Sequence, residues 1–153
     1  SGKKNETIFK QLIEKSPQVK DETRFSLDIK DFDISFVRSL SLEDGAATLV
    51  EFTVRLLSSA LLVILGGTKD KSWKIVVCGG GRKNKFLMKR LNETIFKNIV
   101  IQSIDDYGIN GDFVESQAFA YLAVRSYLKL PISFPNTTGC LNSCTGGTIV
   151  EIK

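Results

Sequence analysis

Apolar residues recur at helical spacing in the first part of the chain. In residues 4–15, Ile8, Leu12 and Ile13 fall on one face of a helix, which predicts a short amphipathic helix there. Pro17 and the charged residues that follow it predict a loop.

The longest apolar pattern predicts a long helix that begins after Ser41. Ser41 is a suitable N-cap residue, and an acidic residue, Asp44, follows it three positions later. Apolar residues then form two stripes at helical spacing. The stripes consist of Leu49, Phe52, Leu56, Ala60 and Val63, and of Val50, Val54, Leu57 and Leu61. Because the stripes cover much of the circumference, we expect this helix to be buried and to end at Gly66 and Gly67.

The second half of the chain predicts strands that alternate with helices. Residues 74–78 predict a buried strand, residues 84–91 a helix and residues 99–101 a second strand. A further helix is expected at residues 112–128. After an irregular stretch rich in Pro, Thr and Gly, residues 148–152 predict a short final strand. With 153 residues, 42% of them hydrophobic, the chain fits one α/β domain over residues 1–153.

Three consecutive glycines, Gly79, Gly80 and Gly81, lie between the first predicted strand and the helix after it. Free backbone N–H groups at a helix N-terminus bind phosphate, so this turn indicates nucleotide chemistry. Such turns also use glycine simply to allow a positive φ, and the segment lacks the G-x-G-x-x-G spacing of a dinucleotide site. The glycines alone therefore leave both interpretations open.

Charged residues are unevenly distributed along the chain. Residues 69–97 hold nine Lys or Arg against two acids, whereas residues 102–115 hold four acids and no base. A basic region beside a glycine turn suits an anionic ligand, although an ordinary solvated surface would explain most of these lysines. Nucleic-acid binding would call for a wider basic face with exposed aromatic residues, so we expect no nucleic-acid partner.

Two acids at the start of the helix expected at residues 112–128 have a structural explanation. Asp112 is placed as N-cap and Glu115 three positions later, so the two would form a capping box without any ligand. For Glu115, a role in binding is the open alternative.

The chain has three cysteines and no histidine. The absence of histidine excludes Ser/His and Cys/His nucleophilic catalysis. Cys78, Cys140 and Cys144 alone do not favour a zinc site, and we expect ordinary thiols in a reducing compartment.

We find no secretory signal and no stretch of about 18 uncharged apolar residues. The longest apolar stretch, residues 46–66, is interrupted by Glu51 and Arg55. We therefore expect a cytoplasmic protein without a membrane partner.

Five segments together resemble the C-terminal lobe of anhydro-N-acetylmuramic acid kinase. They are LEDGAATL (residues 42–49), VCGGGRKN (77–84), GDFVESQAFAYLAVR (111–125), LPISFPNTTG (130–139) and TGG (145–147). The resemblance runs in order from about Gly2 to the end of the chain. Several long motifs in one order are far more specific than a single glycine triplet.

This resemblance implies one lobe of an actin-like, ribonuclease H-like sugar-kinase fold, with ATP and Mg²⁺ as phosphoryl donor. The family reaction opens the 1,6-anhydro bond with water and phosphorylates O6, which yields N-acetylmuramic acid 6-phosphate in peptidoglycan recycling. The residues that the resemblance places on the nucleotide side of the cleft are Gly79, Gly80, Gly81, Arg82 and Asn84. It places Glu115 near the sugar.

Kinases of this fold carry the phosphate-binding loop and the catalytic aspartate in the N-terminal lobe, and we expect neither in this chain. We therefore assign no catalytic residue and no metal ligand to it, and we expect the chain alone to be inactive. The missing lobe and a second copy of the chain are the expected protein partners. The alternatives are a folded remnant without chemistry and an unrelated nucleotide-binding or nucleic-acid-binding module.

Overall fold

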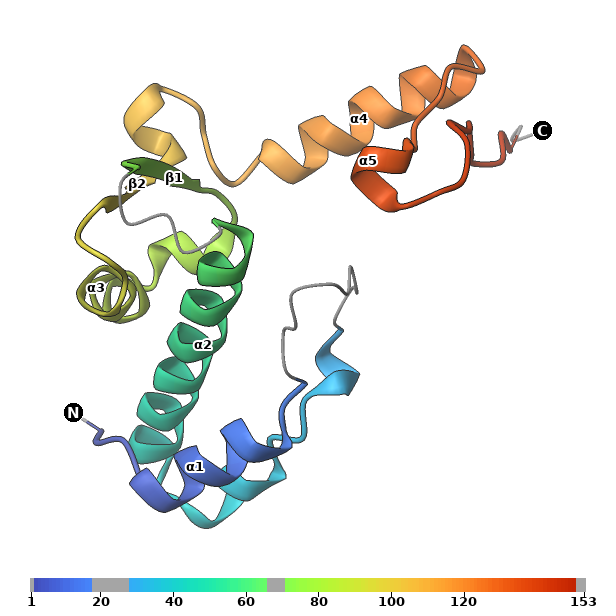
Figure 1. Cartoon of the computed structure of the whole chain (residues 1–153). Helices are drawn as coiled ribbons and strands as arrows, with labels where there is room; N and C mark the ends of the chain where they lie inside the picture. The colour runs from blue at the N-terminus through green and yellow to red at the C-terminus, as the bar shows by residue number, and fades with distance from the viewer. Residues whose placement is uncertain (1, 18–27, 66–70, 151–153) are drawn as a thin grey trace.

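The computed structural model describes residues 2–17, 28–65 and 71–150 (Figure 1). Helices α1 (Glu6–Lys15) and α2 (Leu42–Ile64) confirm the two helices expected in the first half of the chain. Ser41 caps α2 as expected, because its hydroxyl accepts a hydrogen bond from the backbone N–H of Asp44 at 3.2 Å. The expected helix end at residues 66–67 lies outside the described residues.

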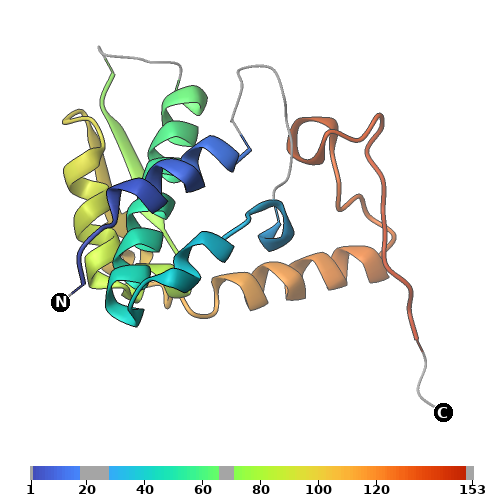
Figure 2. The same ribbon diagram turned by 90° about the horizontal axis from the view of Figure 1, so that it is seen from below.

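Two short 3₁₀ helices, η1 (Ile29–Asp31) and η2 (Ser35–Ser39), lie between α1 and α2. Figure 2 shows α1 lying across the first turns of α2, against which η2 also packs. The backbone N–H of Asn5 donates to the Thr48 hydroxyl of α2 at 3.0 Å, and Leu12 of α1 is only 1% exposed. The first turns of α2 thus form one packing centre of the molecule.

A second packing centre contains a strand-helix-strand unit, as the sequence predicted. Strands β1 (Trp73–Val77) and β2 (Ile99–Ser103) pair in parallel, and helix α3 (Lys85–Thr94) connects them. The core between this unit and α2 consists of buried and partly buried apolar residues. They are Val54, Leu91 and Ile101 at the centre, with Val50, Ile75, Val77, Leu87, Met88 and Ile95 around them.

The sheet is buried on one face only. Val76 of β1 and Val100 of β2, on the opposite face, are 42% and 52% exposed. The expectation of a buried first strand is therefore wrong. Among the described residues, Tyr107 of η4 contacts this face at Lys74 and Gln102, and Val76 and Val100 stay exposed beside it. Parallel sheets in α/β proteins are normally covered on both faces.

Helix α2 is less buried than its apolar stripes predicted. Val54 is buried, but Leu57 and Ile64 in its second half are 42% and 74% exposed. By length and composition alone α2 would suffice to cross a membrane, yet it packs against α1 and α3, and its Glu51 is ion-paired with Arg90 of α3. The absence of a membrane partner stays a prediction.

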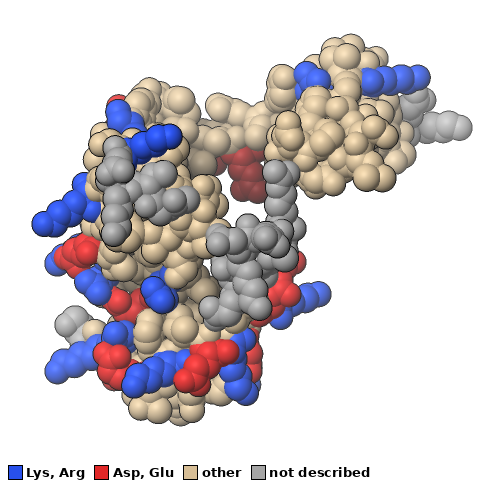
Figure 3. All heavy atoms as spheres, viewed as in Figure 1, with Lys and Arg blue, Asp and Glu red and all other residues tan. Residues whose placement is uncertain are grey.

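The last part of the chain extends away from the sheet (Figure 1). After β2 come the 3₁₀ helix η4 (Ile104–Tyr107), helix α4 (Val114–Tyr127) and the short helix α5 (Pro135–Thr138). No residue of α4 is buried. In Figure 3 the surface over α4 and the following segment is mostly uncharged, whereas charged side chains gather around α1 and the start of α2.

The final strand expected at residues 148–152 is not formed where the structure describes it. Residues 148–150 have no regular structure, and residues 151–152 lie outside the described range. A strand needs a hydrogen-bonded neighbour, and within the described ranges β1 and β2 pair only with each other. The apolar residues of this segment were therefore insufficient to define a strand.

Candidate functional site

The three glycines lie at the carboxyl end of β1, the edge at which open α/β sheets bind ligands. Gly79 has a φ of +79°, a conformation that favours glycine. A Cβ atom placed on Gly79 or Gly80 would meet nothing within 4 Å, so this side of the turn is open. Within the described ranges the backbone N–H groups of Gly80 and Gly81 have no hydrogen-bond acceptor. They are free to donate to an anionic ligand.

The glycines do not open the next α-helix, contrary to the expectation from the sequence. A 3₁₀ helix, η3 (Gly80–Lys83), comes first, and α3 begins at Lys85 with Asn84 as its N-cap. The side-chain oxygen of Asn84 accepts a hydrogen bond from the N–H of Leu87 at 3.0 Å. Asparagine is a strong N-cap residue and glycine a poor helix former, which explains the later start. The predicted contact of Asn84 with a nucleotide stays a prediction.

Arg82 connects the glycine turn to the acidic loop after β2. Its Nε and Nη2 donate to the two carboxylate oxygens of Asp105, at 2.6 and 3.0 Å. Its Nη1 donates to Asp112 Oδ1 at 2.7 Å and to the carbonyl oxygen of Gly79 at 2.9 Å. Lys83 Nζ lies 2.5 Å from the second carboxylate oxygen of Asp112. The basic and acidic segments noted in the sequence therefore neutralise each other here.

Gly111 completes the contact between the two loops. The N–H of Gly79 donates to the carbonyl oxygen of Gly111 at 3.1 Å, and the N–H of Gly111 donates to Asp105 Oδ1 at 2.9 Å. A Cβ atom on Gly111 would lie only 2.4 Å from Arg82 Nε, so the guanidinium occupies the space that a side chain would need. We call Gly79, Arg82, Asp105, Gly111 and Asp112 together the arginine clip.

Ion pairing shifts the pKa values of the arginine clip. Hydrogen bonds from Arg82, and next from the N–H of Gly111, hold the pKa of Asp105 well below its usual range. Hydrogen bonds from Arg82 and then Lys83 lower the pKa of Asp112. The two carboxylates in turn raise the pKa of Arg82 above its ordinary value. All three groups are therefore charged at neutral pH.

Acid should weaken the fold through these carboxylates. Because the folded-state pKa of Asp105 and Asp112 is lowered, their contribution to stability is present above the unfolded pKa of about 4 and is lost as the pH falls through the folded value. Urea unfolding followed by circular dichroism between about pH 7 and about pH 3 measures the first part of this loss, which begins near the unfolded pKa. The variant Asp105→Asn should be less stable at neutral pH and should lose less stability on acidification.

Glu115→Gln, which removes one surface charge outside the clip, is the control for this series. It should keep the acid dependence of the wild-type chain. An unchanged acid dependence in Asp105→Asn would contradict the prediction.

The capping box expected at Asp112 and Glu115 is not formed. Helix α4 begins at Val114, and its N-cap, Phe113, provides no side-chain hydrogen bond. Asp112 instead pairs with Arg82 and a neighbouring lysine, because hydrogen bonds from cations to a carboxylate are stronger than those from backbone amides.

Glu115 lies exposed in the first turn of α4. It has no hydrogen bond or ion pair with any residue that the structure describes, so its carboxylate is free. A capping box is present one element earlier, where Ser103 and Asp106 cap η4. The prediction for Asp112 and Glu115 is therefore wrong, and the capping box at η4 was not predicted from the sequence.

The basic residues near the glycine turn are partly neutralised as well. Arg90 is ion-paired with Glu51 and Glu93, and Lys89 Nζ lies 3.8 Å from a Glu93 carboxylate oxygen. Lys85 remains exposed at the start of α3. The region is less basic than the sequence alone indicated.

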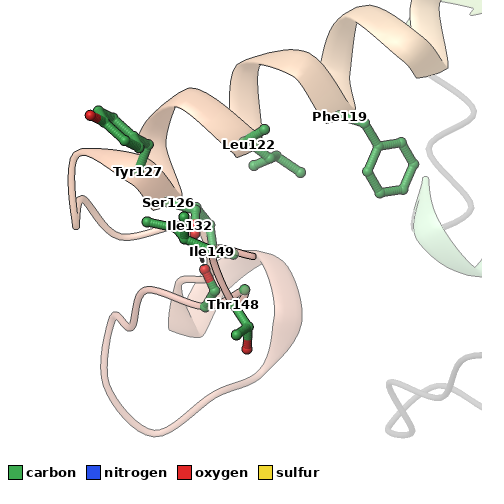
Figure 4. Close-up of a pocket in the computed structure, with 10 residues that line it drawn as sticks. Phe119, Leu122, Ser126, Tyr127, Ile132, Thr148 and Ile149 are labelled. Carbon is green, nitrogen blue, oxygen red and sulfur yellow. Dashed lines mark hydrogen bonds between the residues drawn. The ribbon is translucent and has the colours of Figure 1, made fainter. Parts of the chain in front are cut away.

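A hollow that the sequence did not indicate lies between α4 and the C-terminal segment (Figure 4). It has a volume of about 430 Å³, and Leu122, Ile132 and Ile149 gather in it. The hydroxyl of Ser126 donates to a backbone carbonyl of the C-terminal segment, and a Cβ atom on Gly147 would lie 2.9 Å from that hydroxyl oxygen. The glycine pair at residues 146–147 thus lets this segment approach α4. Among the described residues, no charged side chain lines the hollow.

The comparisons with known proteins agree on one family. The family model for anhydro-N-acetylmuramic acid kinase matches residues 4–151. The anhydro-N-acetylmuramic acid kinase of Pelagibacter ubique is 47% identical over 98% of this chain and 40% of its own length. The kinases of that name from Zymomonas mobilis and Caulobacter vibrioides are 45% and 39% identical, over 81% and 99% of this chain and 32% and 39% of their own lengths.

The chain thus spans about 40% of the length of the curated relatives that it matches. The match covers every segment of the candidate site, from the glycine turn to α4. The relatives are named for a phosphotransferase reaction. This chain belongs to the anhydro-N-acetylmuramic acid kinase family.

Proposed function

We propose that this chain provides the nucleotide-binding side of an anhydro-N-acetylmuramic acid kinase, as the C-terminal lobe of an actin-like sugar-kinase fold. The phosphates of ATP would bind at the turn of Gly79, Gly80 and Gly81, through the free backbone N–H groups of Gly80 and Gly81. The observation that carries the proposal is the open glycine turn at the carboxyl end of β1, in a chain of a kinase family. Mg²⁺ would enter bound to the phosphates of ATP, as it does in many phosphoryl-transfer enzymes.

For the sugar we propose Glu115. Its carboxylate is exposed and unpaired among the described residues, and an ionised carboxylate can accept hydrogen bonds from sugar hydroxyl or amide groups. The start of α4 is tied to the glycine turn through Asp112, which keeps the two proposed subsites in a fixed relation. In the whole protein the reaction would convert 1,6-anhydro-N-acetylmuramic acid to N-acetylmuramic acid 6-phosphate in the bacterial cytoplasm.

In the full-length relatives, about 60% of the chain lies outside the part matched here. We propose that this unmatched part packs against the exposed apolar surface of α4. Five large apolar or aromatic residues on α4 and at its end are more than half exposed. They are Phe119, Tyr121, Val124, Tyr127 and Leu128. Exposed apolar surface of this extent is typical of interaction sites. A second copy of the chain could occupy the same surface when the unmatched part is absent.

Replacing Gly80 tests the nucleotide site. Gly80→Val should weaken the binding of ATP with Mg²⁺ by about tenfold or more, because the side chain would keep phosphate from the backbone N–H groups and at least one hydrogen bond to a charged group would be lost. Isothermal titration calorimetry measures the affinity. The fold should be unaffected, since no atom lies within 4 Å of the new Cβ.

Gly80→Ala, with a smaller side chain at the same position, should weaken binding less, and circular dichroism should show both variants folded. Equal ATP affinity in the wild-type chain and in Gly80→Val would contradict the proposed site. A folded wild-type chain without saturable ATP binding would favour the alternative of a remnant without chemistry.

A further inference from the structure

The donors of Arg82 are almost fully used within its own chain. A guanidinium carries five N–H donors. Four hydrogen bonds hold this one: two to Asp105, one to Asp112 and one to the carbonyl oxygen of Gly79. The side chain is only 5% exposed. One of the five donors, on Nη2, remains for a ligand.

The charges around Arg82 lead to the same conclusion. Carboxylate oxygens of Asp105 and Asp112 lie 2.6 and 2.7 Å from guanidinium nitrogens, and Lys83 compensates only one of these two negative charges. A phosphate brought to this guanidinium would be repelled by both carboxylates. Arg82 therefore lacks the free positive charge that a phosphate ligand requires.

The arginine clip instead connects three segments of the chain. Arg82 holds the carbonyl group of Gly79 in the glycine turn, Asp105 in η4 and Asp112 just before α4. Asp112 precedes Glu115 by three positions. The same guanidinium thus fixes the glycine turn and the start of the helix that carries Glu115.

We propose that Arg82 is a positioning residue, which holds the glycine turn and the start of α4 in one arrangement and does not itself contact phosphate. The expected effect of Arg82 on nucleotide affinity rests on the proposed function. The role of Arg82 in holding the glycine turn and the start of α4 together does not depend on the proposed function.

The variants Arg82→Lys, Asp105→Asn and their combination test the proposal. Titration calorimetry with ATP and Mg²⁺ should find each single variant weaker by about tenfold or more, the loss expected when hydrogen bonds to charged groups are broken. The double variant should be no weaker than the weaker single variant, because all three break the same contact. If Arg82 were a phosphate ligand, Asp105→Asn would free its guanidinium. Unchanged or tighter ATP binding in Asp105→Asn would therefore overturn the proposal.

Amide hydrogen exchange measures the coupling without any nucleotide. The N–H groups of Gly79 and Gly111 should exchange about tenfold faster or more in both single variants, because the clip that holds these hydrogen bonds is broken. Lys89→Gln, which removes one exposed positive charge from α3, should leave their exchange unchanged. Unchanged exchange in Arg82→Lys and Asp105→Asn would overturn the positioning role.

The two measurements separate the inference from the proposed function. A wild-type chain that does not bind ATP would overturn the nucleotide site, and hydrogen exchange would still decide on the clip. If Arg82→Lys fails to fold, Asp105→Asn decides alone, since it keeps the size of the side chain and removes only its charge.

Discussion

Incubated with ATP, Mg²⁺ and 1,6-anhydro-N-acetylmuramic acid, this chain alone is expected to form no sugar phosphate above the uncatalysed background. Phosphoryl transfer depends on positioning and charge stabilisation from both sides of a cleft, and the family resemblance assigns the catalytic aspartate to the part of the protein that this chain does not match. Losing that positioning should lower the rate by about 10⁵-fold or more. Phosphorus NMR detects the sugar phosphate directly.

A positive control uses the part of a full-length relative that this chain does not match. A sugar-phosphate signal should appear when it is mixed with this chain, and it should be reduced when the chain carries Gly80→Val. A signal from this chain alone would contradict our assignment of the catalytic groups. No signal in the mixture, with both parts folded and associated, would favour a remnant without chemistry.

Truncating Leu91 is expected to have the largest effect on stability. Leu91 of α3 is 5% exposed and packs at the centre of the core between α2, α3 and the sheet. Leu91→Ala should lower the free energy of unfolding by about 2–5 kcal/mol through lost burial and the cavity left behind. Since small domains are stable by only about 5–15 kcal/mol, urea unfolding at constant pH should show an unmistakable shift.

Leu141→Ala is the matched control, because the same atoms are removed from a side chain that is 96% exposed. It should change the free energy of unfolding by less than about 0.5 kcal/mol. Equal effects of the two variants would mean that the core is not centred on α3.

The sequence predicted the elements whose signals are local. Helices α1 and α2 and the strand-helix-strand unit follow from apolar spacing, and the cap at Ser41 follows from a hydroxyl three positions before its partner. The sequence prediction was wrong where the structure of a segment depends on residues far away in the chain. The exposed face of β1 and the irregular residues 148–150 depend on which segments are available to cover or pair with them.

The candidate site divides in the same way. The glycine turn could be predicted because three consecutive glycines favour a turn by their own conformational freedom. The open space around Gly79 and Gly80 agrees with this prediction. The arginine clip was missed because Arg82 is separated from Asp105 and Asp112 by 23 and 30 residues. The one available signal was the opposite charge of residues 69–97 and 102–115. That signal does not indicate which individual residues pair. Asp112 was misassigned as a helix cap for this reason.

The unbroken length of α2 has a mechanical consequence. Its 23 residues form a rod about 34 Å long, with α1 against its first turns and α3 beside its middle. Because α3 and the sheet contact the rod near its middle, a tilt of about 5° there moves the start of the rod by about 1.5 Å. Kinases commonly close around their substrates. In a closing enzyme, α2 would carry a rotation of the sheet along its length to α1, which contacts its first turns.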